Sequence, residues 1–571
     1  MRTRPWAALL ALALLAAACH GGRSGGDGGG RQVARGVKGG TLRVLDLNDV
    51  EAFDPGIAYG AADLALLRGV VRELFAFDSR AVGERAAVPV PDLSDGTPDL
   101  SQDGRVYTFR IRRGVFYAPP VNREVRADDF VYAVERQFDR AHPSPNPYTG
   151  LISGVAAFAA GKAKTISGLR ALDDHTLRIT LVRPAGDFTG ILTLPFFSPV
   201  PREYGRRFRP GPDYAAHVVG SGPYTLKRYQ PGRLIELVRN ENWDPRTDPL
   251  RSAWVDAITV RMDGGSADGI QQAIERGDAD LNLDRVPPPN ADLRRLSTDP
   301  DLAGQFSVQT TGCVHYLSLQ TDAGPTSDRR VRQAVNFAID KQAVVLALGG
   351  RYAGEPASTI LSPTLAGYSA FDLYPSPESR GDPDRARRLL AAAGHPRGVT
   401  LRYVGQSNGQ GPALLAALQS SLGRAGIQLD PTTYPGYQVY TRSLQLQAKK
   451  DEHQVGAAGW CPDFPGNGGR SLIGVLLDGR AIHPTANNNY GDYANPTVDA
   501  LIDQAYAATE PGARDALWAR IDRLIMEDAA WAPLTYDREA YFWSARVRNW
   551  TFSPWVSNPD VANLWLDPNT P

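Results

Sequence analysis

Residues 400–429 read TLRYVGQSNGQGPALLAALQSSLGRAGIQL, and this stretch decides the fold class. Residues 400–404 are predicted to form a strand, residues 414–422 a helix, and residues 427–429 a second strand. Two strands that are joined through a helix pair in parallel within one sheet. Strand and helix patterns alternate along the rest of the chain, so the sequence predicts an α/β protein with several compact units.

The same stretch contains a candidate catalytic motif. Residues 405–409 read Gly-x-Ser-x-Gly, and Ser407 lies between a predicted strand and a predicted helix, as the nucleophile of a hydrolase elbow does. His453 and His483 lie downstream and could supply the base. However, glycine and polar residues are also ordinary in a strand-to-helix loop. With no metal-protease histidine spacing and no Cys-x-x-Cys, the sequence predicts no enzyme, no catalytic residue, no metal site and no cofactor.

Length and charge limit the other classes of function. A chain of 571 residues exceeds what one hydrophobic core usually serves, so two or three units are expected. Acidic and basic residues balance at 62 each, which gives no basic field to bind nucleic acid. Longer helices are predicted over residues 63–77, 328–348 and 498–528.

The first 19 residues have the layout of a secretory signal peptide. Two arginines precede an apolar run over residues 6–18, which is too short to cross a bilayer core of about 30 Å. The run ends in Ala-Ala-Ala-Cys19, which resembles the lipobox of bacterial lipoproteins, whose cysteine becomes the lipidated first residue. The resemblance implies lipidation at Cys19; the alternative is a plain secretory signal whose end happens to precede a cysteine.

Residues 20–37 are predicted to be a flexible, glycine-rich tether. A flexible run of about 20 residues reaches roughly 25 Å. The expected protein is therefore extracytoplasmic and anchored by an N-terminal lipid, in the periplasm or on the outer face of the cell membrane.

The chain has three cysteines, at positions 19, 313 and 461. If Cys19 takes the lipid, Cys313 and Cys461 remain in an oxidising compartment, where two cysteines suggest one disulfide. The alternative on the count alone is two buried free thiols. A bridge would close a loop of nearly 150 residues and stabilise the fold by about 5 kcal/mol in the chain-entropy model.

Several sequence blocks, in this order, resemble those of one known family. They are GGTLRVLDLNDVEAFDP (39–55), DGRVYTFRIRRGVFY (103–117), VRADDFVYAVER (125–136), GSGPYTLKRYQPG (220–232) and DRRVRQAVNFAIDKQAVV (328–345). The chain is similar to the extracellular solute-binding proteins of ABC transporters, family 5, which include the oligopeptide- and dipeptide-binding proteins. The resemblance covers nearly all of the chain that follows the signal segment.

This resemblance implies a periplasmic-binding-protein type II fold. Two α/β lobes joined by a hinge would close on a ligand, and an extra domain would be inserted in lobe one. The expected boundaries are lobe one at 38–80, 206–308 and 537–571, the inserted domain at 81–205, and lobe two at 309–536.

The resemblance also assigns roles to the segment Gly459-Trp460-Cys461-Pro462-Asp463. In oligopeptide-binding relatives a Trp-Cys-x-Asp segment lines the cleft, its Asp pairs with the peptide ammonium, and its Cys forms a disulfide with a cysteine on the first strand of lobe two. Here Cys461 would pair with Cys313, Asp463 would bind the ammonium, Trp460 would wall a side-chain pocket, and Gly459 and Cys461 would pair with peptide backbone. The alternatives are an Asx turn for Asp463 and core packing for Trp460.

Two further residues are weaker candidates for ligand contact. Val50 precedes the Phe-Asp-Pro of lobe one, and Tyr536 lies at the return into lobe one; core or hinge positions are the alternatives for both. The implied function is peptide capture and delivery to the permease and ATPase subunits of an ABC importer, with a monomer expected. The remaining alternatives are a non-peptide solute, such as an oligosaccharide or metal complex, and a sensor or docking lipoprotein.

Overall fold

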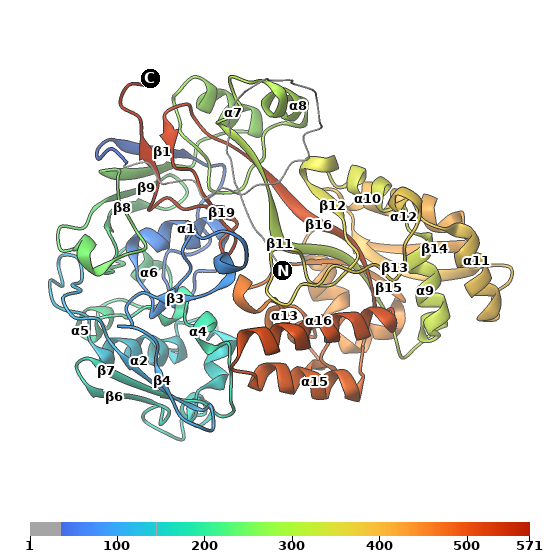
Figure 1. Cartoon of the computed structure of the whole chain (residues 1–571), viewed down its shortest axis with the longest axis horizontal. Coiled ribbons are helices and arrows are strands. Elements are labelled where there is room, and N and C mark those ends of the chain that lie inside the picture. The colour runs from blue at the N-terminus through green and yellow to red at the C-terminus, as the bar shows by residue number, and fades with distance from the viewer. Residues whose placement is uncertain (1–35, 144, 571) are drawn as a thin grey trace, which may run out of the picture. The chain divides into compact units, whose positions relative to one another are not determined.

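The computed structural model of the protein describes residues 36–143 and 145–570 (Figure 1). The described residues form one compact unit. The predicted signal segment 1–19, with Cys19, and most of the predicted tether 20–37 lie outside the described residues. Lipidation of Cys19 therefore remains a prediction.

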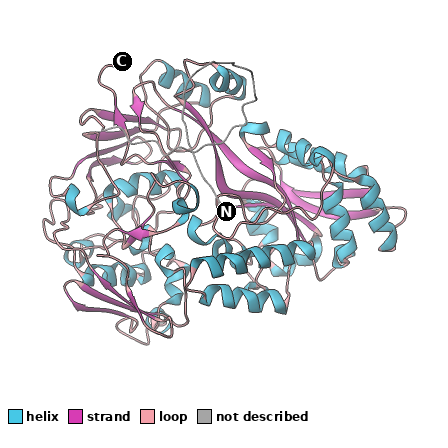
Figure 2. Cartoon of the chain, viewed as in Figure 1, coloured by secondary structure: helices cyan, strands magenta, loops and turns pink. Residues whose placement is uncertain are grey.

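A six-stranded sheet contains the strand–helix–strand unit that indicated the fold class (Figures 1 and 2). In spatial order, its strands are β12 (Gly354–Pro356), β16 (Trp531–Phe542), β11 (Phe306–Leu319), β15 (Val455–Trp460), β13 (Val399–Gln406) and β14 (Ile427–Tyr434). Strands β13 and β14 are parallel, with Val399 opposite Ile427, and α12 (Gly411–Gly423) connects them. The parallel pairing and the α/β class are thus confirmed.

Two four-stranded sheets lie earlier in the chain (Figure 2). The first has the order β1 (Thr41–Leu45), β10 (Ala257–Arg261), β9 (Leu234–Arg239) and β8 (Tyr224–Gln230). The second has the order β4 (Asp99–Leu100), β5 (Val106–Arg110), β7 (Thr176–Thr180) and β6 (Leu169–Asp173). The strands of the first sheet come from two of the ranges expected for lobe one, 38–80 and 206–308, and those of the second sheet come from the range expected for the inserted domain, 81–205.

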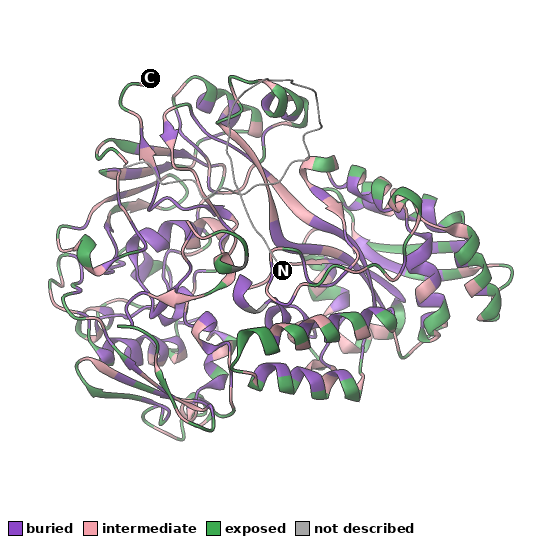
Figure 3. Ribbon diagram, viewed as in Figure 1, coloured by how far each residue is buried: buried purple, intermediate pink, exposed green. Residues whose placement is uncertain are grey.

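Three large hydrophobic cores accompany these sheets, and Figure 3 shows buried residues along their strands. The lobe-two core contains buried residues between Val314 and Tyr536. The lobe-one core runs from Leu42 to Leu566, and the insert core contains residues between Leu74 and Val219 together with Phe464. The lobe-one core also includes Tyr132, from the range expected for the insert. The division into lobes and an inserted domain remains our interpretation of these cores.

Two predicted long helices are broken in the structure, which corrects the sequence-based prediction. Residues 328–348 form α9 (Arg329–Ala338) and α10 (Lys341–Ala347), because Asp340 is extended and its side chain accepts a hydrogen bond from Ala343 N to begin the second helix. Residues 498–528 form α15 (Pro496–Ala507) and α16 (Pro511–Glu527). Pro511 has no N–H to continue the first helix and suits the first turn of the next.

The predicted helix 63–77 is also shorter than expected. Helix α1 (Ala61–Val70) ends at an extended Val71, and residues Phe75–Ala76 form strand β2, which pairs with β3 (Val90–Pro91). Strand pairing at residue 75 therefore overrides the helical spacing of the sequence. The shortened helix leaves residues 71–77 free to run from the lobe-one core into the insert core.

The remaining α-helices are α2 (Ala127–Glu135), α3 (Val155–Ala159), α4 (Phe188–Ile191), α5 (Arg202–Gly205), α6 (Pro212–Ala215), α7 (Ala267–Glu275), α8 (Asn290–Thr298), α11 (Pro383–Ala392), α13 (Gly468–Ser471) and α14 (Ile473–Leu476). Among the helices of the described ranges, none is long and apolar enough to cross a membrane.

Candidate functional site

A disulfide attaches the candidate ligand-binding loop to the six-stranded sheet. Strands β11 and β15 are antiparallel, with Val314 opposite Trp460, so the two neighbouring cysteines lie side by side. Cys313 and Cys461 are bonded, with their Cα atoms 4.0 Å apart. The predicted disulfide is confirmed, and it fixes the point at which the chain leaves the sheet to form the loop of residues 461–467.

This loop joins the lobe-two sheet to the insert core. Phe464 is 1% exposed and is a member of the insert core, where its ring centroid lies 6.0 Å from that of Tyr148. One residue later, Pro465 O accepts a hydrogen bond of 3.1 Å from Ala366 N on the lobe-two side. The loop is thus held from both sides, and Asp463 lies between the disulfide at Cys461 and the buried ring of Phe464.

Asp463 is a half-buried carboxyl group with an unusual environment. The Tyr148 hydroxyl donates a hydrogen bond to Asp463 Oδ2. Burial raises the pKa of Asp463 to about 7, and no cationic side chain of the described residues lowers it. A carboxyl group with these surroundings gains most from a positively charged partner that is brought in from outside.

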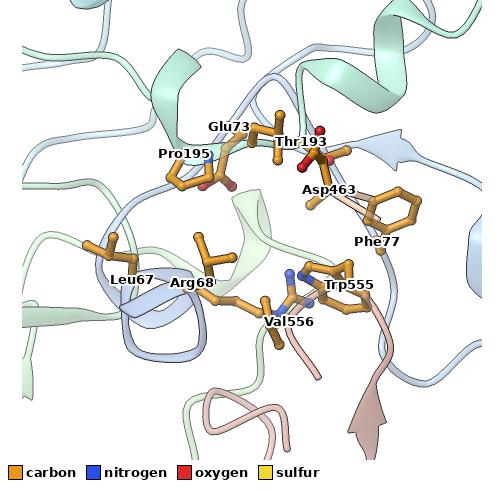
Figure 4. Close-up of a pocket in the computed structure, with 12 residues that line it drawn as sticks. Leu67, Arg68, Glu73, Phe77, Thr193, Pro195, Asp463, Trp555 and Val556 are labelled. Atoms are coloured by element: carbon orange, nitrogen blue, oxygen red, sulfur yellow. The ribbon is translucent and has the colours of Figure 1, made fainter. Parts of the chain in front are cut away.

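Asp463 lines a pocket (Figure 4). The lining residues come from α1, from the segments 73–77, 193–195 and 555–556, and from the loop. They are Leu64, Leu67, Arg68, Glu73, Ala76, Phe77, Thr193, Leu194, Pro195, Asp463, Trp555 and Val556. Of these residues, Leu67 and Val556 belong to the lobe-one core, and Phe77 and Leu194 belong to the insert core.

One wall of the pocket is formed by a cation and an aromatic ring. Arg68 Nε donates a hydrogen bond of 2.9 Å to Asp560 Oδ2, and both side chains are buried. The Arg68 guanidinium carbon lies 4.9 Å from the centroid of the Trp555 ring. The Trp555 ring in turn lies 5.3 Å from that of Phe77. This wall combines an apolar surface with one fixed positive group.

Glu73 is a second buried acid at the pocket. Burial raises its pKa to about 7, although the nearby charge of Arg251 acts in the opposite direction. The contact between Arg251 Nη2 and Glu73 Oε2 is long, at 3.6 Å, and the Ser198 hydroxyl donates to Glu73 Oε1 at 3.3 Å. Near neutral pH, the pocket thus offers two carboxyl groups that are only partly ionised.

The neighbours of Asp463 that the sequence singled out do not line this pocket. Trp460 packs against the lobe-two core and donates its indole N–H to Ser471 O at 2.9 Å. Gly459 lies opposite His315 in the sheet, and its N–H donates to the Tyr440 hydroxyl at 3.3 Å. The ligand contacts expected of Gly459, Trp460 and Cys461 remain predictions.

Val50 and Tyr536 lie in hydrophobic cores. Val50 is 8% exposed and belongs to the lobe-one core. Tyr536 belongs to the lobe-two core, and its hydroxyl accepts hydrogen bonds from the backbone N–H groups of Ser358 and Thr359, at 3.2 and 3.0 Å. Neither residue lines the pocket, and a contact of either one with ligand remains a prediction.

A buried ion pair lies where the insert meets lobe two. Arg470 of α13 donates through Nη2 to Asp187 Oδ1 at 2.7 Å, and both side chains are almost fully buried. The Arg470 guanidinium carbon lies 3.9 Å from the centroid of the Tyr506 ring. Gly186 N also donates to Tyr506 O at 3.0 Å. These contacts keep the insert close to the segment that carries Asp463.

The structure gives no geometric support to Ser407 as a catalytic nucleophile. Residues 405–409 connect β13 to α12, where Ser407 N donates to Tyr434 O at 2.9 Å, as in an ordinary strand-to-helix loop. Within the described ranges, no group of three or more His, Cys, Asp or Glu side chains could hold a metal ion.

Sequence reasoning missed three residues at the site: Tyr148, Arg68 and Trp555. Tyr148 lies 315 positions from Asp463, and Arg68 lies 492 positions from Asp560. No local pattern marks such contacts, because they arise only when the lobes and the insert fold together.

Comparison with known proteins gives consistent matches. The profile of the family described as "Bacterial extracellular solute-binding proteins, family 5 Middle" matches residues 88–471. "Heme-binding protein A" of Haemophilus influenzae is 28% identical over 473 residues, which cover 80% of each chain. "Di/tripeptide-binding protein 4" of Pseudomonas aeruginosa is 30% identical over 503 residues, covering 84% of this chain and 87% of the relative.

A solved structure is similar over almost the whole chain. "Clavulanic acid biosynthesis oligopeptide binding protein 2" superposes with a TM-score of 0.86 at 30% identity, and the match covers 93% of this chain and 96% of that chain. This similarity extends over both expected lobes and the insert, which agrees with the periplasmic-binding-protein fold that the sequence blocks implied.

Proposed function

The chain belongs to the bacterial extracellular solute-binding proteins of family 5, and from this premise we propose that it captures peptides with a free amino terminus. It is a solute-binding protein of an ABC importer, and its family consists of binding proteins without catalytic activity. Capture would be followed by delivery of the peptide to the membrane permease, whose import is driven by the ATPase subunits.

The observation that carries the proposal is the environment of the Asp463 carboxyl group. Its carboxyl group lines the pocket, accepts a hydrogen bond from Tyr148 and has a pKa raised to about 7 by burial. An ammonium group brought into the pocket would stabilise the ionised carboxylate, and a charge-assisted hydrogen bond contributes about 1.5–3 kcal/mol. Such a contact recognises a free amino terminus and is indifferent to the side chains of the peptide.

The names of the relatives support the peptide assignment and also supply a second candidate. A relative at 30% identity is named as a di/tripeptide-binding protein and a solved structure as an oligopeptide-binding protein, whereas a relative at 28% identity is named as a heme-binding protein. We favour peptide over heme because the pocket presents two acidic side chains, Asp463 and Glu73, and the one cation of its described lining, Arg68, already pairs with Asp560. Such a lining suits a cationic amine better than the propionates of a porphyrin.

Native mass spectrometry of the purified protein, followed by denaturation, tests the assignment. We expect short peptides with free amino termini to be released. A porphyrin mass accompanied by the strong visible absorbance of a porphyrin would establish the heme alternative instead. An oligosaccharide or a metal complex would contradict the peptide assignment and assign Asp463 another role.

We also propose that a lipid on Cys19 anchors the protein outside the cytoplasm. The support is the sequence that precedes Cys19, which resembles a lipobox, and the extracellular character of the family. Metabolic labelling with a radioactive fatty acid should mark the wild-type protein and not the Cys19→Ser variant. Equal labelling of the two proteins would contradict the anchor.

A further inference from the structure

A short segment of the inserted domain contacts lobe two outside the pocket. Gly186, which lies just before α4, donates its N–H to Tyr506 O at 3.0 Å. The next residue, Asp187, accepts a hydrogen bond of 2.7 Å from Arg470 Nη2, and both side chains are almost fully buried. Figure 1 shows α4 beside the ends of α15 and α16. A backbone hydrogen bond and a buried ion pair thus join the inserted domain to lobe two.

Phe464 of lobe two is buried in the insert core beside the same segment. Its side chain is 1% exposed, and a Cβ added at Gly190 of α4 would lie 3.1 Å from its ring. The loop that carries Phe464 moves with lobe two, because the disulfide at Cys461 holds one end and Leu472 of the lobe-two core holds the other. The contacts of Gly186, Asp187 and Gly190 with Tyr506, Arg470 and Phe464 are together named the clasp.

The lobes are connected by β11 and β16, and this strand pair contains an irregularity that suits a hinge. At one end, Phe306 lies opposite Phe542, and both pack with helices α7 and α8 of lobe one. At the other end, Val314 lies opposite Tyr536, and both belong to the lobe-two core. The regular pairing is interrupted between Thr310 and Val314. A rotation at this interruption would pull the inserted domain away from lobe two and break the whole clasp.

The clasp buries enough apolar surface to favour the closed arrangement without help from a ligand. Full burial of a phenylalanine side chain favours the form that buries it about 10- to 100-fold. The Asp187–Arg470 pair contributes orientation more than stability, because the desolvation of two buried charges offsets most of their attraction. Opening at the hinge would expose the Phe464 ring to water, so the open form is the minor one.

We propose that the clasp keeps the two lobes together in the ligand-free protein, so that the cleft is closed at rest and opens only transiently. A ligand would enter through the minor open form, and opening would limit the rates at which ligand enters and leaves. This inference concerns the resting conformation of the chain. It goes beyond the proposed peptide function and does not depend on which solute the cleft binds.

Gly186 allows the clasp to be disrupted by a single methyl group. A Cβ at this position would overlap the carbonyl oxygen of Ala508 and would lie 2.8 Å from Thr509 Cα. These are main-chain atoms of lobe two, so no side-chain rotation can relieve the overlap. The φ angle of Gly186 is not positive, so alanine is compatible with the local backbone of the inserted domain. Gly186→Ala therefore opposes the closed form and leaves the residues that line the pocket unchanged.

The experiment compares ligand-free proteins, so no probe ligand is needed. Bound solute is removed by unfolding in guanidinium chloride and refolding with the disulfide intact. Small-angle X-ray scattering then measures the radius of gyration, and hydrogen exchange with mass spectrometry measures the amide of residue 186. The matched control is Gly150→Ala, because Gly150 is an exposed residue of the inserted domain where an added Cβ would meet nothing within 4 Å. A second variant, Asp187→Asn, keeps the shape of the side chain and removes its charge.

We expect the wild-type protein and Gly150→Ala to match the scattering curve calculated from the closed structure. Gly186→Ala should have a larger radius of gyration, and the amide of residue 186 should exchange at least about 10-fold faster once corrected for its intrinsic rate. Asp187→Asn should also raise this exchange rate, because the buried guanidinium of Arg470 would lose the carboxylate of Asp187.

Two results would overturn the inference. One is a ligand-free wild-type protein that scatters as a pair of open lobes, and the other is a wild-type exchange rate in both Gly186→Ala and Asp187→Asn. The wild-type curve and Asp187→Asn decide the question even if alanine at position 186 prevents folding. Because no ligand takes part, these results are separate from a failure of the peptide assignment, which the mass of the released solute tests.

Discussion

Asp463→Asn is expected to stabilise the ligand-free protein at alkaline pH while it weakens peptide binding. Burial raises the pKa of Asp463 from the ordinary 3.8 to about 7, so the folded protein holds this proton more tightly than the unfolded chain does. Below about pH 4, both states are protonated and the carboxyl group contributes nothing to the pH dependence of stability. Between about pH 4 and 7 the unfolded chain ionises first, so folding stability falls; above about pH 7 the whole penalty is present.

The size of this effect follows from the same pKa. A rise from 3.8 to about 7 corresponds to at most about 4 kcal/mol at about 1.36 kcal/mol per pH unit. Because Asp463 keeps part of its surface in water, we expect about 1–2 kcal/mol at pH 8. Asparagine has nearly the same shape and can still accept the hydrogen bond from Tyr148, so the substitution removes the charge and preserves the packing.

The assay is thermal or urea unfolding of ligand-free wild-type and Asp463→Asn protein at pH 4 and pH 8. The variant should be the more stable protein at pH 8, and the two should agree closely at pH 4, where the comparison serves as its own control. A variant that is less stable than the wild type at pH 8, or a difference that is the same at both pH values, would refute the reasoning about Asp463.

Three further predictions concern the attachments of the binding loop. Replacing Cys313 and Cys461 together by serine should lower the free energy of unfolding by up to about 5 kcal/mol, the chain-entropy value for a separation of 148 residues, and unfolding by urea measures it; an unchanged midpoint would contradict this. Phe464→Ala should cost about 3–5 kcal/mol, because the ring is fully buried in the insert core; a loss below about 1 kcal/mol would show that the loop is not anchored there. Asp187→Ala should cost about 3–5 kcal/mol by leaving the Arg470 charge buried, and Asp187→Ala with Arg470→Met should recover part of that loss in the same unfolding assay; no recovery would assign the loss to packing.

Local chemistry determines how much of this protein could be predicted from its sequence. The strand–helix–strand unit over 400–429 was predictable, because periodicity and connection length fix parallel pairing without knowledge of the rest of the chain. The breaks at Asp340 and Pro511 were also readable in principle, from a capping side chain and a missing N–H. These two local signals of a helix end were weaker than the helical spacing of the apolar residues on either side of them.

The site was predictable only in part. The cysteine count and the resemblance of the Trp-Cys-Pro-Asp segment indicated Asp463 and the Cys313–Cys461 bridge, and the bridge is present. The position of Arg68 at the pocket was not predictable, since its environment is made by Asp560 and Trp555, nearly 500 positions away in sequence. Val50, a weaker candidate whose alternative was a core position, is a member of the lobe-one core, and its contact with ligand remains a prediction.

The central claim is that Asp463 binds the ammonium group of the ligand, and one calorimetric comparison tests it most directly. The peptide recovered from the protein and its N-acetylated counterpart are titrated into the wild type, Asp463→Asn and Asp522→Asn, a control acid that is buried outside the pocket with a pKa also raised to about 7 by burial. We predict that Asp463→Asn loses about 2–5 kcal/mol of affinity for the free amine and that the control retains the wild-type preference for it over the acetylated form. Equal affinity of wild type and Asp463→Asn for the free peptide would contradict the claim.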